Sequence, residues 1–198
     1  MSSSPLSLLR RADPKSVDDA EIAAIGRSDR DRGFEMLLAK YRDRIYQHAL
    51  YITKDSEGAF DVAQDVFVRG YHEPRLFDED FRAKAWLFRV CTNRCYNIVR
   101  DRKRRRNLLE KHSKSNAGLR ESHQAINTVL DKELSEGMGR ALATLSADHR
   151  TILTLRYYHD LSYEEIALSL EIKLGTVMSR LSRAKLRLHD ALVAEGER

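Results

Sequence analysis

The aromatic residues of this chain fall into two separate groups. Twelve of the fifteen lie between Phe34 and Tyr96, none lies between positions 97 and 156, and the rest are Tyr157, Tyr158 and Tyr163. Because a hydrophobic core needs bulky apolar anchors, this distribution predicts one core before about Arg100 and another after about Asp131. The stretch 107–130 also lacks a clear apolar period, which is typical of a flexible linker. Residues 1–16 are expected to form a disordered tail.

The first group lies on helical patterns. From Phe34 to Ile52 apolar residues recur at steps of three and four, which predicts a long amphipathic helix. A second helix is expected from about Ser56 to Tyr71. A third begins near Asp80 and is expected to bury Ala85, Phe88, Cys91, Cys95 and Val99. No stretch alternates with period two for long enough to be a strand. The fold is therefore predicted to be all-α, with two small helical domains at 17–106 and 131–198.

The stretch from Leu161 to Leu188 carries the most specific local signal. Ser162 and Glu165 have the spacing of a capping box, which predicts a helix that begins at Tyr163. A short break at 171–175 separates it from a second helix that begins at Thr176 or Val177. Two short helices joined in this way indicate a helix-turn-helix. A further helix at about 148–158 would cover the back of this motif.

The two sides of that second helix differ in chemistry. Its predicted inner side is apolar, with Val177, Leu181, Ala184 and Leu188. The outer side is basic, and no acid occurs between Gly175 and His189. Such a face suits the major groove, because Arg can bind a guanine edge and both Lys and Arg neutralise phosphates. The candidate DNA contacts are Met178, Ser179, Arg180, Ser182, Arg183 and Lys185.

The predicted third helix carries a second candidate nucleic-acid face. Opposite its apolar side lie Trp86, Arg89, Asn93, Tyr96, Asn97 and Arg100. Aromatic rings among Arg and Asn suit unstacked bases, which stack on rings and bond to amides. Six of the seven residues from Arg100 to Arg106 are basic, and such a run can follow a phosphate backbone.

One acidic cluster interrupts this basic chain, whose net charge is +5. It consists of Asp61, Gln64 and Asp65, with Phe67 close by, and it predicts a protein partner that carries Arg or Lys. There is no apolar run of membrane-spanning length, and the first residues are not expected to act as a secretory signal. Two cysteines are too few for a disulfide scaffold, so we expect a protein of the reducing cytoplasm in which Cys91 and Cys95 are buried packing residues.

Taken together, these segments resemble the extracytoplasmic-function (ECF) group of the sigma-70 family of bacterial transcription initiation factors. The resemblance covers about residues 17–194. Three blocks carry it: Asp61-Val-Ala-Gln-Asp-Val-Phe; Ala85-Trp-Leu-Phe-Arg-Val-Cys-Thr-Asn with the basic run after it; and Leu161-Ser-Tyr-Glu-Glu-Ile-Ala together with Gly175-Thr-Val-Met-Ser-Arg-Leu-Ser-Arg-Ala.

The resemblance implies a role for each segment. Residues 17–106 would be the region 2 domain, in which Asn93 reads a base of the −10 promoter element and Asp61, Gln64, Asp65 and Phe67 bind the clamp helices of core RNA polymerase. Residues 131–198 would be region 4, which contacts the polymerase flap and reads the −35 element, with Arg150 as a DNA backbone contact. It also implies an anti-sigma factor as partner, a monomer when free of partners, no cofactor, no metal and no enzymatic activity, because polymerase supplies the catalysis.

Two other classes of function are weighed against this one. An ordinary helix-turn-helix regulator would bind duplex DNA without polymerase and usually as a dimer, but no dimerisation heptad is present and the Asp61 cluster would be unexplained. A metal-dependent hydrolase or nuclease would need a catalytic motif, and neither HExxH, a P-loop, GxSxG nor an acidic metal box occurs.

Overall fold

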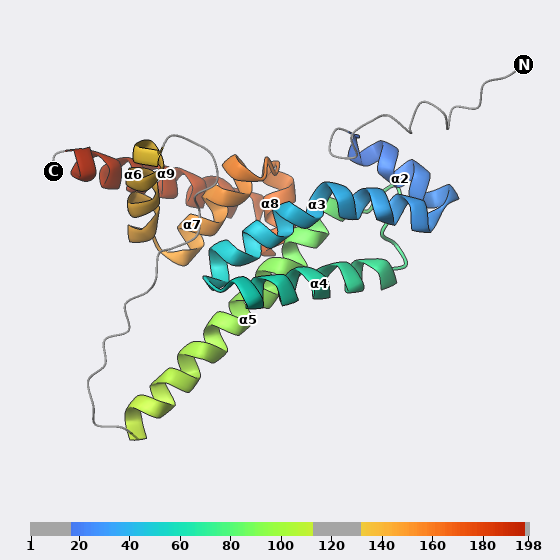
Figure 1. The fold of residues 1–198 in the computed structure, drawn as a ribbon. Helices are drawn as coiled ribbons and strands as arrows, with labels where there is room; N and C mark the ends of the chain where they lie inside the picture. The colour runs from blue at the N-terminus through green and yellow to red at the C-terminus, as the bar shows by residue number, and fades with distance from the viewer. Residues whose placement is uncertain (1–16, 113–131, 197–198) are drawn as a thin grey trace, which may run out of the picture.

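The computed structural model describes residues 17–112 and 132–196, and within these residues it contains helices and no strand (Figure 1). The all-α prediction is confirmed. The predicted tail at 1–16 and most of the predicted linker lie outside the described residues. The N-terminal half (17–112) contains α2 (Asp19–Ser28), α3 (Arg30–Thr53), α4 (Ser56–His72) and α5 (Ala83–His112). The C-terminal half (132–196) contains α6 (Lys132–Thr144), α7 (Ala147–Leu153), the π-helical turn η1 (Thr154–Tyr158), α8 (Tyr163–Leu170) and α9 (Leu174–Gly196).

Helices α3, α4 and α5 form the bundle of the N-terminal half. Helix α3 begins where the Asp29 carboxylate accepts a hydrogen bond from the Arg32 amide at 3.0 Å, and it ends at Lys54, whose φ is 56°. The middle of its predicted apolar stripe is buried, and Ile45 and Ala49 have no exposed surface, whereas Phe34, Leu38 and Ile52 are half-buried. Helix α2 crosses α3 where Gly26 and Gly33 meet, so closely that a side chain on Gly33 would collide with the Gly26 backbone.

Helix α5 leaves the bundle partway along its length (Figure 1). Cys95 is fully buried, but Val99, which the sequence pattern places on the same buried side, is 38% exposed. That expectation was wrong, because the helix has passed the end of α3 at this point. The helix also continues to His112, so the beginning of the stretch predicted as linker is helical. Arg102 ties the extension to the bundle through the Asp55 carboxylate and the Thr53 carbonyl.

The helix-turn-helix forms as the sequence predicts. The Glu165 amide donates to the Ser162 hydroxyl at 3.1 Å, and the Ser162 amide donates to the Glu165 carboxylate at 2.7 Å, which completes the capping box. Helix α9 begins at Leu174, before the expected Thr176 or Val177, because the amides of both residues bond to the Lys173 carbonyl and extend the first turn backwards.

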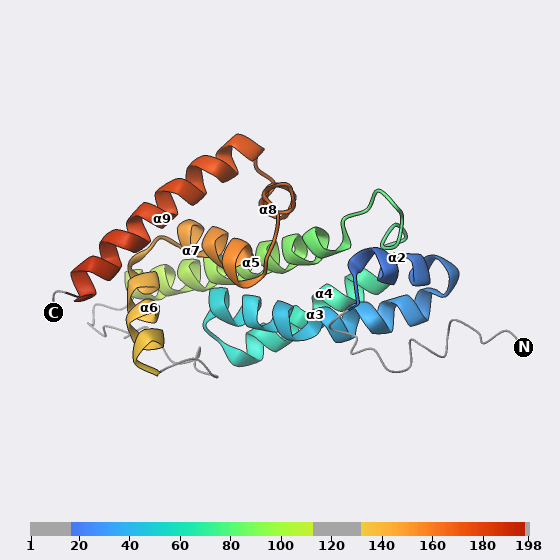
Figure 2. The same cartoon turned by 90° about the horizontal axis from the view of Figure 1, so that it is seen from above.

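The two halves pack on each other, and their buried side chains form one continuous cluster rather than the two separate cores that the aromatic distribution suggests. Helix α8 lies against α5, and the segment after η1 lies against α3 (Figure 2). The Ser169 hydroxyl of α8, fully buried, donates to the Ala85 carbonyl of α5 at 3.0 Å. Helix α8 is therefore buried on two sides: one side packs against α9 and the other against α5, which joins the cores of the two halves.

Candidate nucleic-acid and protein interfaces

The outer face of α9 is open to solvent. Its inner residues Val177, Leu181 and Ala184 are at most 2% exposed, whereas Met178 is 56% exposed. Ser179, Ser182 and Arg183 are exposed beside it. Figure 2 shows α9 along the outside of the molecule. The orientation deduced from helical periodicity is therefore confirmed, and this face is free to lie in a DNA groove.

The polar side chains of this face differ in the contacts that they make within the protein. The Arg183 Nε donates to the Ser179 carbonyl at 3.2 Å, which leaves the end of the guanidinium free. Arg180 lies 3.8 Å from the Asp148 carboxylate. Lys185 lies 5.6 Å from the centre of the Tyr157 ring, and a hydrogen bond to Tyr157 raises the pKa of this lysine. The half-buried Arg150 lies on α7 and not on α9.

The candidate face on α5 is partly covered. Asn93, Asn97 and Arg100 are exposed, whereas Trp86, Arg89 and Tyr96 are half-buried. The Tyr96 hydroxyl donates to the Thr151 hydroxyl of α7 at 3.0 Å, and burial raises the pKa of this tyrosine. Arg89 lies 3.5 Å from the Glu171 carboxylate at the end of α8. The C-terminal half therefore occupies part of the surface that the sequence assigns to unstacked bases.

An apolar groove lies between α3 and α4 and has a volume of about 680 Å³. We call it the α3–α4 groove, and its lining includes Phe34, Leu38, Tyr46, Phe60, Gln64, Phe67, Val68 and Tyr71. Phe60, Val68 and Tyr71 are 58%, 57% and 43% exposed. Exposed apolar side chains gathered in a groove are typical of a protein interface. Sequence reasoning missed these residues, although large apolar side chains on the polar side of an amphipathic helix are a visible signal.

The structure divides the acidic cluster beside this groove. Asp61 and Gln64 are exposed. Asp65 instead lies 3.2 Å from Arg69 and 3.4 Å from Arg94, so its charge is already paired within the chain. Phe67 is only 7% exposed and lies in the floor of the groove. Asp65 and Phe67 are therefore less accessible than Asp61 and Gln64, since Asp65 is ion-paired within the chain and Phe67 is almost fully buried.

Cys91 and Cys95 are buried packing residues, as the sequence predicts. Their Sγ atoms lie 3.7 Å and 4.0 Å from the carbonyl oxygens of Ile45 and Ala49. Burial raises the pKa of the Cys91 thiol well above its ordinary value, so the thiol stays protonated. In the part of the chain that the structure describes, no group of three or more His, Cys, Asp or Glu side chains is placed to hold a metal ion.

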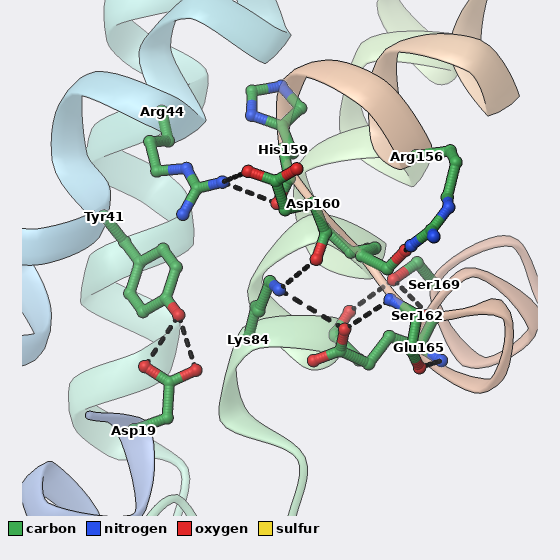
Figure 3. Close-up of polar contacts among 12 residues, drawn as sticks. Asp19, Tyr41, Arg44, Lys84, Arg156, His159, Asp160, Ser162, Glu165 and Ser169 are labelled. Carbon is green, nitrogen blue, oxygen red and sulfur yellow. Dashed lines mark hydrogen bonds and ion pairs between the residues drawn. The ribbon is translucent and has the colours of Figure 1, made fainter.

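Complementary charges line the contact between the halves (Figure 3). The basic groups belong to the N-terminal half: Arg44 donates to the His159 carbonyl at 2.5 Å, and Lys84 donates to the Asp160 carbonyl at 2.8 Å. Lys84 also lies 3.3 Å from the Glu165 carboxylate of the capping box, and both side chains are largely buried. The buried imidazoles of His48 and His159 meet beside these contacts, with ring centres 5.1 Å apart. Sequence reasoning did not identify this cluster.

Comparison with known proteins identifies both halves. Residues 37–105 match the family model "Sigma-70 region 2", and residues 135–188 match "Sigma-70, region 4". The chain is 30% identical to the RNA polymerase sigma-H factor of Pseudomonas aeruginosa, over 88% of this chain and 93% of that protein. It is 35% identical to the ECF RNA polymerase sigma factor SigL of Mycobacterium tuberculosis, over 71% of this chain and 77% of that one.

Solved structures agree with this result. The sigma factor RpoE of Bartonella quintana, solved in complex with the anti-sigma factor NepR, matches with a TM-score of 0.63 at 27% identity, over 80% of this chain and 96% of that one. CnrH, solved in complex with the cytosolic domain of CnrY, has the same fold, with a TM-score of 0.60 at 24% identity over 89% of this chain and 97% of that one.

These matches decide between the classes of function that the sequence leaves open. Region 2 followed by region 4 accounts for the candidate nucleic-acid faces on both α5 and α9, whereas an ordinary helix-turn-helix regulator accounts for the face on α9 alone. Across residues 17–112 and 132–196, no helix is both long and apolar enough to cross a membrane. The chain therefore belongs to the extracytoplasmic-function group of the sigma-70 family: it is an alternative sigma factor, which directs RNA polymerase to promoters and is not itself an enzyme.

Proposed function

We propose that α9 reads the −35 element and that the exposed face of α5 reads the −10 element. The observation that carries this assignment is the open side of α9, where Met178, Ser179, Ser182 and Arg183 project into solvent while the opposite side is buried. Arg183 supplies the free guanidinium end that a guanine edge requires, and Met178 supplies an apolar surface for a thymine methyl group. Arg180 and Lys185 flank these side chains on α9, and Arg150 lies on the neighbouring helix α7; all three would contact phosphates.

On α5, Asn93 is the central exposed amide, with Asn97 and Arg100 on the following turns. Amides of this kind bind the edges of unstacked bases, and the basic run that follows holds the strand by its phosphates. Capture of flipped bases offsets the cost of local melting, which is on the order of a few kcal/mol for each base. Two weak readers on one chain gain effective concentration only when the promoter spacing lets both bind.

We further propose that the α3–α4 groove and its rim bind core polymerase at the clamp helices. The groove offers apolar area for burial, and the exposed carboxylate of Asp61 and amide of Gln64 offer partners for Arg or Lys side chains at the rim. Asp65 contributes indirectly, because its ion pair with Arg94 of α5 holds α4 in position. The C-terminal half would reach the polymerase flap.

Regulation by an anti-sigma factor in the cytoplasm completes this proposal. RpoE of Bartonella quintana was solved with the anti-sigma factor NepR, and CnrH with the cytosolic domain of CnrY. The similarity of this chain to RpoE supports a partner of the same class. The free protein is expected to be monomeric.

Run-off transcription with purified core polymerase on a promoter library tests the promoter assignment. Arg183→Ala removes one bidentate base contact, worth about 1–3 kcal/mol, and should lower transcription about 5- to 150-fold from promoters that depend on the −35 element. Arg32→Ala, on the exposed side of α3 outside all these faces, is the matched control. Binding to core polymerase should be unchanged in both variants. An equal loss on every promoter would show that Arg183 does not read sequence.

A further inference from the structure

The contact between the two halves contains a feature that sequence-specific transcription does not require. His48 of α3 and His159 of the segment after η1 are both fully buried. Their rings lie edge to face, and Phe88 packs on both of them, with ring centres 5.3 Å and 4.6 Å away. The His48 Nε2 lies 2.9 Å from the Thr92 hydroxyl, but the other three ring nitrogens of the pair have no hydrogen-bond partner among the described residues.

The charged groups around the pair make protonation unfavourable while the halves are packed. Arg44 of α3 and Lys84 of α5 both face His159, and both lower the pKa of its imidazole. The Asp160 carboxylate is 84% exposed and lies 3.9 Å from Arg44, and Glu165 is engaged by Lys84. Burial lowers the pKa of His48 to about 3, and burial as the largest cause, followed by the charges of His48, Arg44 and Lys84, lowers the pKa of His159 to about 2.

Packing of the halves also covers functional surface. Tyr96 is bonded to Thr151, and Arg89 is paired with Glu171, so two residues of the candidate −10 face are engaged by the C-terminal half. Tyr96 becomes available to DNA only when α7 leaves α5, whereas Arg89, whose side chain is 40% exposed, needs only to leave its ion pair with Glu171. The closed arrangement is therefore one that limits promoter contact, and its stability depends on the groups buried within the contact.

We propose that the contact between the halves is a proton-sensitive latch, in which the uncharged His48–His159 pair holds the sigma factor closed and protonation of the pair opens it. When the halves separate, His159 enters water and recovers an ordinary pKa near 6.5. His48 loses its cover from His159 and becomes accessible on the same side.

The direction of the pH effect follows from which state binds more protons. The closed state holds both imidazoles neutral, so below about pH 7.5 the open state binds more protons and is favoured as the pH falls. Above about pH 7.5 both states bind almost no protons at these sites and the balance is flat. Between about pH 7.5 and about pH 5.5, the closed-to-open ratio should fall about tenfold from His159 alone, and up to about 100-fold if His48 is fully released.

Distance measurement between two spin labels in the free, full-length protein tests the latch. Glu57→Cys on α4 and Arg187→Cys on α9 place the labels at exposed sites of different halves, and the native cysteines are too buried to be labelled. We expect a second, longer distance population that grows about tenfold relative to the short one between about pH 7.5 and about pH 5.5. An unchanged distribution over this range would overturn the proposal.

Two substitutions separate the pair from other titrating groups. His159→Leu keeps an apolar side chain in the contact and removes the titration of His159, so its distance distribution should depend on pH less than that of the wild type, with only His48 left to titrate. His72→Gln, at an exposed position of α4 away from the contact, should behave like the wild type. A wild-type pH response in His159→Leu would assign the effect elsewhere and overturn the latch.

A second measurement does not depend on the folding of a variant. In an NMR titration of the wild-type protein, the ring Cε1 resonance of His159 should show an imidazolium only in the open state, which is the population with the long distance. An imidazolium signal in the closed population would refute the proposal. Both measurements use neither polymerase nor DNA, so their outcome is independent of the promoter assignment.

Discussion

Phe60 and Phe67 lie seven positions apart on α4, and the structure predicts that loss of Phe60 weakens polymerase binding whereas loss of Phe67 lowers stability. Phe60 is 58% exposed at the α3–α4 groove, whereas Phe67 is 7% exposed beneath it. A Phe side chain buries on the order of 200 Å², so docking of polymerase can remove at most about 115 Å² of Phe60 surface from water. At about 25 cal/mol per Å², full or half burial of that area corresponds to about 1.5–3 kcal/mol.

Phe60→Ala should therefore raise the Kd for core polymerase about 10- to 150-fold and leave the free energy of unfolding nearly unchanged. Phe67→Ala should lower the free energy of unfolding by about 3–5 kcal/mol, because it leaves a cavity between α3 and α4. Competition binding to core polymerase and urea denaturation measure the two quantities separately. This pairing distinguishes a contact residue from a residue that only supports the groove.

Leu108→Ala is the matched control for Phe60, because Leu108 is also 58% exposed but lies on the α5 extension, away from the groove. Its Kd for polymerase should match that of the wild type. If Phe60→Ala and Leu108→Ala changed the Kd equally, the groove would not be the docking surface. A loss of less than about 1 kcal/mol of stability in Phe67→Ala would contradict its place in the core.

Two further predictions concern the rim of the groove and the capping box. Asp61→Ala combined with Gln64→Ala should weaken polymerase binding, mainly by lowering the association rate, and the loss should be smaller at high salt because these groups are exposed. Glu79→Ala, at a side chain that is 85% exposed in the loop before α5, should leave polymerase binding unchanged. An effect of equal size in the two variants would refute the rim assignment. Ser162→Ala should lower the free energy of unfolding by about 1 kcal/mol and Tm by about 2–4 °C, because it removes the cap of α8. Ser179→Ala, whose hydroxyl bonds only within the exposed face of α9, should leave the Tm unchanged in the same thermal scan.

Features that depend on neighbours in the chain could be predicted from the sequence. The capping box joins Ser162 to Glu165, and the inward stripe of α9 repeats every three or four positions, so helical geometry alone determines both. The burial of Cys91 and Cys95 follows from the same periodicity. These local rules were sufficient for the all-α class, for the helix-turn-helix and for the side of α9 that faces solvent.

The tertiary structure decided everything that joins distant segments. The sequence pattern places Asp65 in an outward acidic cluster, but in the folded protein it lies 3.4 Å from Arg94 of another helix. The pattern likewise predicts an exposed ring for Tyr96, but its hydroxyl donates a hydrogen bond to Thr151 of the other half. The α3–α4 groove and the His48–His159 pair likewise need helices brought together from separate parts of the chain. The periodicity of a helix determines which side chains share a face, but only packing determines which faces meet and which remain open.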